Sequence, residues 1–422
     1  MLYKGRWPVA SDDERKAFGA RVAALRKQRG IKQTELATAV GRTPSWVSQV
    51  ERGVQPVSRL DVLQLLADAL GVSVQALNPD APVASVPPPT VPEGPNDLDA
   101  ARLTISGHPA LGALLAGRAA ATERTSLADL SHQVDVLWEL THTARFAELS
   151  AQVGPLVDRL EAAVRTAATA DRPALHALLA RVYQALAAAF VRQDEADAAW
   201  IAADRAIRAA EQSGDVLPVF AGIYRLAQAF VRLKRLDQAE HAATTAVRAL
   251  ETHGEDALSV PEGLSVLGSL RLILALVHAR SGNRDQARAE ISEARSVARR
   301  IGADRNDFNL EFGPTNVEIQ AVSTAVELGD AGEALDIGAR INAEALSPER
   351  RSRLLMDLGR AHAQRRHVGE AVEYLLRAEE LAPETVRSHT ASRAAIRELT
   401  LIAGRTAPPE LVGLAERSAA LD

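Results

Sequence analysis

The alternation of hydrophobic and polar positions between Gly30 and Gly53 predicts two short helices that pack against each other. Five apolar residues form two stripes with helical spacing, namely Leu36, Ala37, Val40, Val47 and Val50. Thr43 followed by Pro44 is typical of a helix start, because threonine caps helix N-termini and proline is tolerated at the first helical position. Gly41 would lie in the turn between the two helices. The segment therefore predicts a helix-turn-helix with a polar outer face.

Similar signals surround this segment and predict a small helical domain over residues 1–78. Ser11 precedes three acidic residues, which predicts a helix start, and this first helix would run to Arg29 and end at Gly30. Two further helices are predicted near Leu60–Leu70 and Val74–Leu77. Together with the helix-turn-helix, they make a five-helix domain.

Residues 79–100 are predicted to form a proline-rich linker. Seven of the twenty prolines lie in residues 79–97, and this stretch has no apolar periodicity. Proline-rich segments favour an extended conformation without a packed core.

From residue 101 to residue 422 the chain predicts repeated helical hairpins. Five segments each carry two small or apolar residues seven positions apart, which places both on one helix face. These pairs are Ala199/Ala206, Ala239/Ala246, Ala287/Ala294, Ala334/Ile341 and Ala371/Ala378. Small residues at such positions allow two antiparallel helices to approach closely. We expect more divergent hairpins in residues 101–169 and one or two capping helices in residues 385–421.

The repeat pattern resembles tetratricopeptide repeats, although the anchor residues are 37 to 48 positions apart and the usual repeat has 34 residues. The predicted fold is therefore all-α, with an N-terminal helix-turn-helix domain, a linker and a C-terminal tetratricopeptide-like α-solenoid.

Composition narrows the class of protein. The chain of 422 residues is 47% hydrophobic but only 4% aromatic, and it contains no cysteine. Disulfides, zinc–thiolate sites and thiol catalysis are thereby excluded, and a reducing cytoplasm is expected. The N-terminus lacks the apolar region of a signal peptide. The strongest apolar stretch, residues 266–277, is 12 residues long and contains Arg271, so we expect no membrane span.

Charge is distributed unevenly between the predicted domains. Residues 1–78 contain 12 Lys and Arg against 7 Asp and Glu, a balance of +5, whereas the remaining residues contain 37 against 47, a balance of −10. A basic domain attached to an acidic one is typical of a DNA-binding module whose companion avoids DNA.

Residues Arg15 to Asn78 resemble the lambda-repressor-like helix-turn-helix family, also called XRE or Cro/cI. The resemblance rests on the segments LRKQRG, QTELA and LADALGVSVQAL, on the helix-turn-helix itself, and on the pair Arg26 and Glu51. It implies that Glu51 is a structural partner of Arg26 and not a DNA contact.

The resemblance also implies which residues would face DNA. Gln33 would meet a phosphate, and the positions of Pro44, Ser45 and Gln49 would face base edges. Proline has no side-chain donor, so base reading would fall to Ser45 and Gln49, and glutamine can bind adenine through two hydrogen bonds. Trp46 would lie against the sugar–phosphate backbone or a thymine methyl. The expected DNA-binding residues are Lys32, Gln33, Arg42, Thr43, Ser45, Trp46, Ser48, Gln49, Arg52 and Arg59.

A tetratricopeptide array forms a concave groove from the first helix of each hairpin, and the inward positions of this chain are mostly polar. They are Arg181, Gln184, Arg192, Tyr224, Gln228, Arg232, Ser269, Asn316, Ser323, Arg353, Met356 and Arg360. Amides match peptide backbones and arginines match carboxylates, so these residues predict a ligand groove. The alternative for any one of them is ordinary solvated helix surface.

The segment from Phe308 to Gln320 interrupts the helical pattern with Gly313 and Pro314. Two interpretations stay open: the segment shapes one wall of the groove, or Phe308 and Phe312 plug the array.

Catalytic and cofactor motifs are not evident. His278 and His362 fall at buried repeat positions, and the chain contains no HExxH, no phosphate-binding glycine loop and no GxSxG motif. We expect no cofactor, no metal and no enzymatic activity.

The whole chain resembles bacterial transcriptional regulators that join an XRE-type head to a tetratricopeptide sensor, similar to the peptide-responsive RRNPP regulators. The resemblance implies a cytoplasmic homodimer that binds a double-stranded DNA operator and responds to a peptide or small-molecule effector in the groove. In the alternative, the repeats are a scaffold for a protein partner and bind no small ligand.

Overall fold

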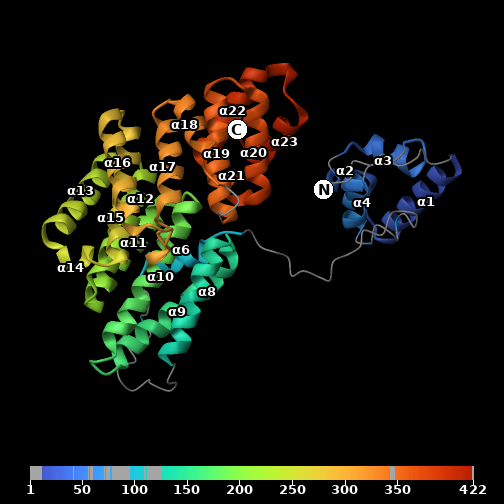
Figure 1. The fold of residues 1–422 in the computed structure, drawn as a ribbon. Coiled ribbons are helices and arrows are strands. Elements are labelled where there is room, and N and C mark those ends of the chain that lie inside the picture. The colour runs from blue at the N-terminus through green and yellow to red at the C-terminus, as the bar shows by residue number, and fades with distance from the viewer. Residues whose placement is uncertain are drawn as a thin grey trace. The chain divides into compact units, whose positions relative to one another are not determined.

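The computed structural model describes residues 12–40, 42–55, 57, 60–70, 72, 77, 96–108, 111, 126–342 and 347–420. The chain divides into two compact units, residues 1–93 and 94–422. Every regular element in the described residues is a helix (Figure 1), which confirms the all-α prediction. Residues 1–11, Arg59 and most of the linker lie outside the described residues.

In its described residues the N-terminal unit contains four helices: α1 (Asp12–Gln28), α2 (Gln33–Ala39), α3 (Pro44–Glu51) and α4 (Leu60–Leu70). Their positions confirm the predicted pattern. Gly30, which follows α1, has a φ of +69°, a conformation that glycine adopts without strain. The buried core includes Val22, Leu36, Val47 and Leu66. The predicted fifth helix near Val74–Leu77 falls mostly outside the described residues.

The second unit, which we term the body, is a series of antiparallel hairpins. The first part contains α6 (Asp99–Ser106), α8 (Leu127–His142), α9 (Phe146–Thr166), α10 (Arg172–Arg192), α11 (Ala196–Ser213), α12 (Val216–Arg232), α13 (Leu236–His253) and α14 (Glu255–Leu258). The second part contains α15 (Pro261–Arg280), α16 (Arg284–Ile301), η2 (Asp307–Asn309), α17 (Pro314–Glu327), α18 (Ala331–Gly338), α19 (Pro348–Gln364) and α20 (Val368–Leu381). The end is formed by α21 (Pro383–Ser388), α22 (Thr390–Ala403), η4 (Gly404–Thr406) and α23 (Pro409–Arg417).

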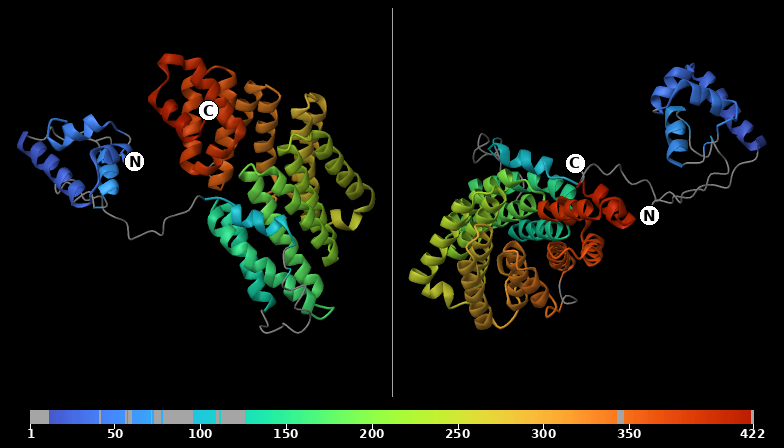
Figure 2. Two further views of the ribbon diagram at one scale, coloured as in Figure 1. Left: turned by 180° about the vertical axis from the view of Figure 1, so that it is seen from behind. Right: turned by 90° about the horizontal axis from the view of Figure 1, so that it is seen from above.

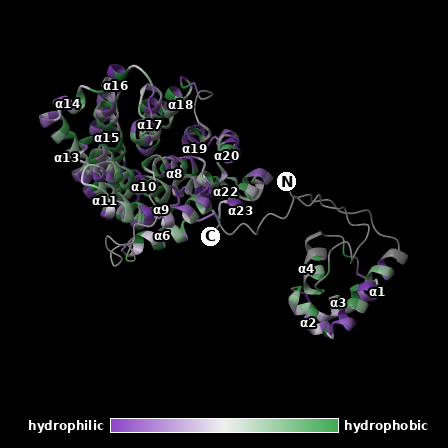
Figure 3. Ribbon diagram, turned by 90° about the horizontal axis from the view of Figure 1, so that it is seen from below, coloured by the Kyte–Doolittle hydropathy of each residue, from purple (hydrophilic) through white to green (hydrophobic). Residues whose placement is uncertain are grey.

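The hairpins follow one another in a curved stack, as the views of Figure 2 show for the body. The first helices α10, α12, α15, α17 and α19 lie side by side in that order, and α22 contacts α19. Figure 3 shows hydrophobic and hydrophilic residues interspersed along most helices, as expected for helices that bury one face. The stack therefore brings the first helices together on one inner surface.

Small residues set the distance between paired helices, as the sequence predicted. Ala199 and Ala206 of α11 and Ala239 of α13 are fully buried, and Ala287, Ala294, Ala371 and Ala378 are equally buried in α16 and α20. The prediction that Ala334 and Ile341 lie on one helix face was wrong. The helix α18 ends at Gly338, so Ile341 lies beyond it, and Ile341 is half-buried.

The body begins earlier than the predicted boundary at residue 101. Leu98 is fully buried, and the Asn96 side-chain amide donates to the Ala144 carbonyl at 2.9 Å. The Asn96 side-chain oxygen accepts the Ala147 N–H at 2.9 Å. Residues 96–100 therefore pack as part of the body and not as linker.

Among the described residues, two body helices have the length and composition of a membrane span, which the stretch 266–277 alone did not indicate. They are α10, with 21 residues, and α15, with 20 residues, and 78% and 83% of their most apolar windows are buried inside the structure. Apolar helices packed in this way are typical of a protein core.

The segment between α16 and α17 has both roles that the sequence left open. Phe312 is fully buried, and a β-carbon added to Gly268 would lie 2.0 Å from its ring, so the ring lies directly on the backbone of α15. Asn309 and Glu311 line a cavity on the inner surface. The segment therefore plugs the array and also forms a wall of the groove.

We predict that Gly268→Ala destabilises the protein by about 1–3 kcal/mol, because the added methyl group overlaps the Phe312 ring in a packed core. Thermal or urea unfolding of the full chain measures this change. Gly369→Ala in α20 is the matched control, since a β-carbon there meets no atom within 4 Å. An unchanged midpoint for Gly268→Ala would contradict the packing described here.

Candidate functional site

The helix α3 of the N-terminal unit is anchored at its start and along its inner face. The Thr43 hydroxyl accepts the Trp46 N–H at 3.2 Å, and Pro44 occupies the first helical position, as predicted. Val47 and Val50 are buried against the core. These anchors leave the opposite face of α3 toward solvent.

Glu51 at the end of α3 ties the N-terminal unit together. Its carboxylate accepts hydrogen bonds from Arg26 Nε at 2.5 Å and Arg26 Nη2 at 3.1 Å. Gln33 Nε2 of α2 donates to the same carboxylate at 2.6 Å. Burial alone would raise the pKa of Glu51, but the bonds from Arg26 and Gln33 hold it below its ordinary value. The predicted Arg26–Glu51 pair is confirmed as a structural contact that fixes α3 against α1.

The residues expected to face DNA differ in exposure. Lys32, Arg42, Thr43, Ser45 and Arg52 are exposed, whereas Gln33, Trp46, Ser48 and Gln49 are half-buried. The Trp46 ring packs partly on the core, and the Arg42 guanidinium lies over it at 5.8 Å from the centroid. Arg42 therefore covers the ring that we expected to lie against the sugar–phosphate backbone. Together these side chains form a polar, basic surface beside α3.

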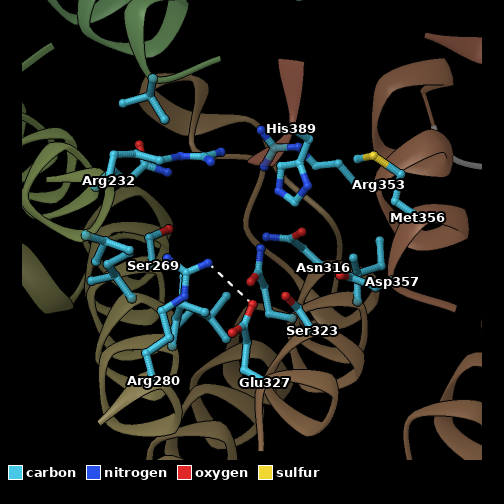
Figure 4. Close-up of a pocket in the computed structure, with 18 of the residues that line it drawn as sticks. Arg232, Ser269, Arg280, Asn316, Ser323, Glu327, Arg353, Met356, Asp357 and His389 are labelled. Atoms are coloured by element: carbon cyan, nitrogen blue, oxygen red, sulfur yellow. Dashed lines mark hydrogen bonds and ion pairs between the residues drawn. The ribbon is translucent and has the colours of Figure 1, made fainter. Parts of the chain in front are cut away.

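The inner surface of the body contains two cavities that together form the groove. The larger, about 120 Å³, is shown in Figure 4 and is lined by residues from α12, α15, α17 and α19 and by His389. The smaller lies beside it and shares Tyr224, Gln228, Asn316 and Arg353 with the first. Because these residues border both cavities, the two lie next to each other on the inner surface, and we call them together the groove.

An ion-pair network forms the floor of the larger cavity. Glu327 accepts from Arg360 at 3.1 Å and from Arg280 at 3.3 Å, and Arg360 also donates to Asp357 at 2.9 Å. Burial favours the neutral form of Glu327, yet the Arg360 and Arg280 charges hold its pKa below the ordinary value. Burial raises the pKa of Asp357 despite its contact with Arg360. The arginines at the floor are thus largely neutralised.

The smaller cavity contains a buried arginine without a carboxylate partner among the described residues. Arg225 is 7% exposed and donates to the Gln228 side chain at 3.2 Å and the Asn309 carbonyl at 2.7 Å. It also lies over the rings of Trp138 and Tyr224, at 5.5 and 5.4 Å. Burial lowers the pKa of Arg225 to about 10. Neutral groups therefore hold this cation inside the body.

Comparison with known proteins supports the assignment of the N-terminal unit. Residues 17–78 match a family model described as a helix-turn-helix domain. This chain carries a helix-turn-helix domain. The result confirms the resemblance drawn from Arg15 to Asn78.

A curated relative matches the same region. The HTH-type transcriptional regulator PrpR of Mycobacterium tuberculosis is 36% identical over 74 residues, which is 18% of this chain and 15% of that protein. The match thus spans less than a sixth of the relative's length and concerns the helix-turn-helix domain only.

Two solved structures are similar over more of the chain at low identity. PlcR of Bacillus thuringiensis, in complex with the peptide PapR7 and DNA, is 13% identical, with a TM-score of 0.37 over 83% of this chain and 98% of that one. The apo form of ComR from Streptococcus vestibularis is 12% identical, with a TM-score of 0.21 over 74% of this chain and 99% of that one. These scores are too low to carry an argument about function.

Beyond the helix-turn-helix domain, the structure gathers most of the predicted groove residues. Nine line the larger cavity: Tyr224, Gln228, Arg232, Ser269, Asn316, Ser323, Arg353, Met356 and Arg360. Arg192 lines the smaller one.

Two predicted groove residues, Arg181 and Gln184, line neither of the two cavities. Arg181 pairs with Asp135, and Gln184 is 2% exposed and donates to the Pro218 carbonyl at 3.1 Å. The cavities lie beside Val191, near the end of α10. Gln184 and Arg181 precede Val191 by seven and ten residues, so they lie about 10 to 15 Å from it along the helix axis.

Sequence reasoning missed Arg280, Glu327, Asp357 and His389, which also line the larger cavity. A signal existed for the first two. Arg280 and Glu327 are the last residues of α15 and α17, the position that Arg232 occupies in α12. His389 precedes the capping helix α22, which has no counterpart in the repeat.

We predict that Glu51→Ala lowers the stability of the helix-turn-helix domain by up to about 3 kcal/mol, because it leaves Arg26 largely buried without its carboxylate. Hydrogen exchange in α1 and α3 of the full chain measures this change. Glu35→Ala is the control: the exposed Glu35 carboxylate accepts the Lys32 N–H in the capping box of α2 and, among the described residues, bonds to no residue of α1 or α3. Equal exchange in the two variants would contradict the role of Glu51.

The same pair predicts a pH dependence. Because the pKa of Glu51 is lowered in the folded state, its contribution is present above the unfolded value of about 4.3 and is lost as the pH falls through the folded value. In Glu51→Ala, the rate of hydrogen exchange in α3 should therefore depend less on pH in the acid range than in the wild type.

Proposed function

We propose that this protein is a homodimeric, sequence-specific DNA-binding transcriptional regulator whose operator binding is modulated by a peptide or small molecule in the body groove. The helix-turn-helix domain supplies DNA binding through the exposed face of α3. One observation supports the regulatory part: the inner faces of successive first helices enclose a polar groove that is richer in cations than in anions.

The charge balance of the groove favours an effector with negative charge or with many hydrogen-bond acceptors. Seven arginines line the two cavities: Arg192, Arg225, Arg232, Arg280, Arg350, Arg353 and Arg360. Four carboxylates face them: Glu311, Glu327, Glu349 and Asp357. Buried charges are costly unless they are paired. An excess of three cations on an inner surface is therefore better explained by the binding of a ligand than by stabilisation of the fold.

Neutral side chains supply the directional contacts of the groove. Ser269, Asn316 and Ser323 point toward the larger cavity from α15 and α17 (Figure 4). The amide of Asn316 has both donor and acceptor atoms, so it can bind a peptide group or a polar small molecule.

On the DNA side, we predict that Gln49→Ala reduces discrimination between the preferred operator and a scrambled duplex by about 1–3 kcal/mol, because a bidentate base contact is lost. Arg52→Ala should instead weaken binding to both duplexes and flatten the salt dependence, because a phosphate contact is lost. Fluorescence anisotropy with an operator selected from random duplexes measures both. Undiminished discrimination by Gln49→Ala would refute the assignment of α3 as the base-reading helix.

On the effector side, Asn316→Ala should abolish the response of operator affinity to the effector while ligand-free DNA binding stays intact. Couplings between two sites are typically 1–3 kcal/mol, so the wild-type response should be roughly 5- to 150-fold. Anisotropy with and without the low-molecular-mass fraction of the native cell extract tests this expectation.

Asn283→Ala, an exposed position between α15 and α16, is the matched control and should respond like the wild type. A full response in Asn316→Ala would show that the effector does not bind in this groove. If only a protein of the extract changes DNA binding, the body acts as a scaffold for a partner.

A further inference from the structure

One end of the larger cavity brings two arginines and a histidine together from three different elements. Arg232 is the last residue of α12, Arg353 lies in α19, and His389 precedes α22. Figure 4 shows the guanidinium groups of Arg232 and Arg353 directed toward each other from opposite sides, beside the His389 ring. The three side chains are far apart in sequence, so the curvature of the stack creates this arrangement.

Neither arginine has a carboxylate at hydrogen-bond distance among the described residues. The Arg232 guanidinium is 3.9 Å from Asp194 Oδ1, and that of Arg353 is 3.6 Å from Glu349 Oε1. By contrast, Arg360 on the cavity floor donates to two carboxylates. The positive charge of the cavity is therefore concentrated at the end that Arg232 and Arg353 form.

The two charges raise each other's energy because they share a partly enclosed space. Burial, followed by the charge of Arg353, lowers the pKa of Arg232 to about 10. Like charges in one partly enclosed space are destabilising unless an anion lies between them. The protein nevertheless keeps both in a wall that faces a cavity.

His389 adds a neutral donor to the same wall. Its Nδ1 accepts the Ser392 N–H at 3.3 Å, which caps α22, and lies 3.0 Å from the Ser392 hydroxyl. With Nδ1 accepting the Ser392 N–H, the proton of the neutral ring lies on Nε2. Burial, followed by the charge of Arg232, lowers the pKa of His389 well below its ordinary value. The ring is thus a neutral N–H donor beside two guanidinium groups.

We propose that Arg232, Arg353 and His389 form a binding site for an oxyanion, a carboxylate or phosphate group carried by a small molecule. Guanidinium groups bind both kinds of oxyanion through paired hydrogen bonds, and an anion between the two arginines would remove their repulsion. This inference rests on the proposed function, because it names the chemical class of the groove ligand.

The cavity volume sets the size of the ligand. About 120 Å³ is close to the 150 Å³ of a cavity that admits benzene, so the part of the ligand held here has few non-hydrogen atoms. Ser269, Asn316 and Ser323 line the remainder of the cavity and would bind neutral polar groups of the same molecule.

The test is isothermal titration of the full chain with inorganic phosphate and, separately, with succinate, at an ionic strength held constant with sodium chloride. We expect saturable binding of at least one probe at millimolar concentrations, and the stronger of the two identifies phosphate or carboxylate as the preferred group. Arg232→Gln and Arg353→Gln should each weaken that binding roughly 10- to 100-fold, the loss of charged hydrogen bonds. Arg181→Gln is the matched control, because Arg181 is paired with Asp135 and lies outside the cavity.

A second measurement separates binding from a structural role. Without probe, Arg232→Gln should leave the thermal midpoint unchanged or raise it, because it relieves repulsion with Arg353. A structural arginine would instead lower the midpoint when removed. If Arg232→Gln does not fold, Arg353→Lys keeps the charge and loses the paired hydrogen bonds, and it should still weaken binding.

Three results would overturn the oxyanion site: no saturable binding of either probe, equal binding by the cavity variants and the wild type, or equal loss in Arg181→Gln. A failure of the oxyanion site can be distinguished from a failure of the proposed function. If an effector fraction still changes operator affinity through Asn316 while both probes fail, the regulator remains and only the oxyanion class is refuted.

Discussion

Close packing of paired helices through alanine and glycine is the constraint on which the body depends. A β-carbon on Gly359 would lie 2.9 Å from Leu375, and one on Gly338 would lie 2.5 Å from Leu358, so these helix pairs have no room for larger side chains. Because small residues occupy the contacts within and between hairpins, long polar side chains are left for the inner surface of the first helices. The arginines of the groove lie on this surface, and the stacking of hairpins brings them close to one another.

The segment between α16 and α17 is held in a strained conformation next to this surface. Phe308, Asn309 and Glu311 all have φ near +50°, which costs of order 1–3 kcal/mol for each such residue. Local contacts offset this cost: the Ser265 hydroxyl donates to Asp307 at 2.6 Å, and Arg225 donates to the Asn309 carbonyl at 2.7 Å. A ligand that competes for Arg225 would therefore act directly on the backbone that carries Phe312 into the core.

Periodicity predicted the helices and much of the groove, because a repeated unit places equivalent residues at equivalent positions. The inward residues of α12, α15, α17 and α19 followed from this rule. It failed at the ends of the array, where α10 meets the divergent α8 and where His389 belongs to a capping element. It also failed at Ile341, because the sequence gives no sign that α18 ends at Gly338.

Two kinds of information were not accessible from the sequence. The burial of α10 and α15, which decides between a core helix and a membrane span, depends on neighbours distant in the chain. The partners of each arginine depend on the curvature of the stack. Arg360 finds one carboxylate, Asp357, in its own helix, but its second partner is Glu327 of α17, whereas the nearest carboxylate oxygen to Arg232, on Asp194, is 3.9 Å away.

In the proposed regulator, the state of the groove and the binding of DNA are coupled. Coupling is reciprocal, so DNA that shifts the protein between two states must also alter the groove. Hydrogen exchange of the full chain with operator duplex, compared with scrambled duplex, measures this without knowledge of the effector. We expect altered exchange in α12, α17 and α19 with the operator alone; changes confined to the helix-turn-helix domain would contradict the coupling.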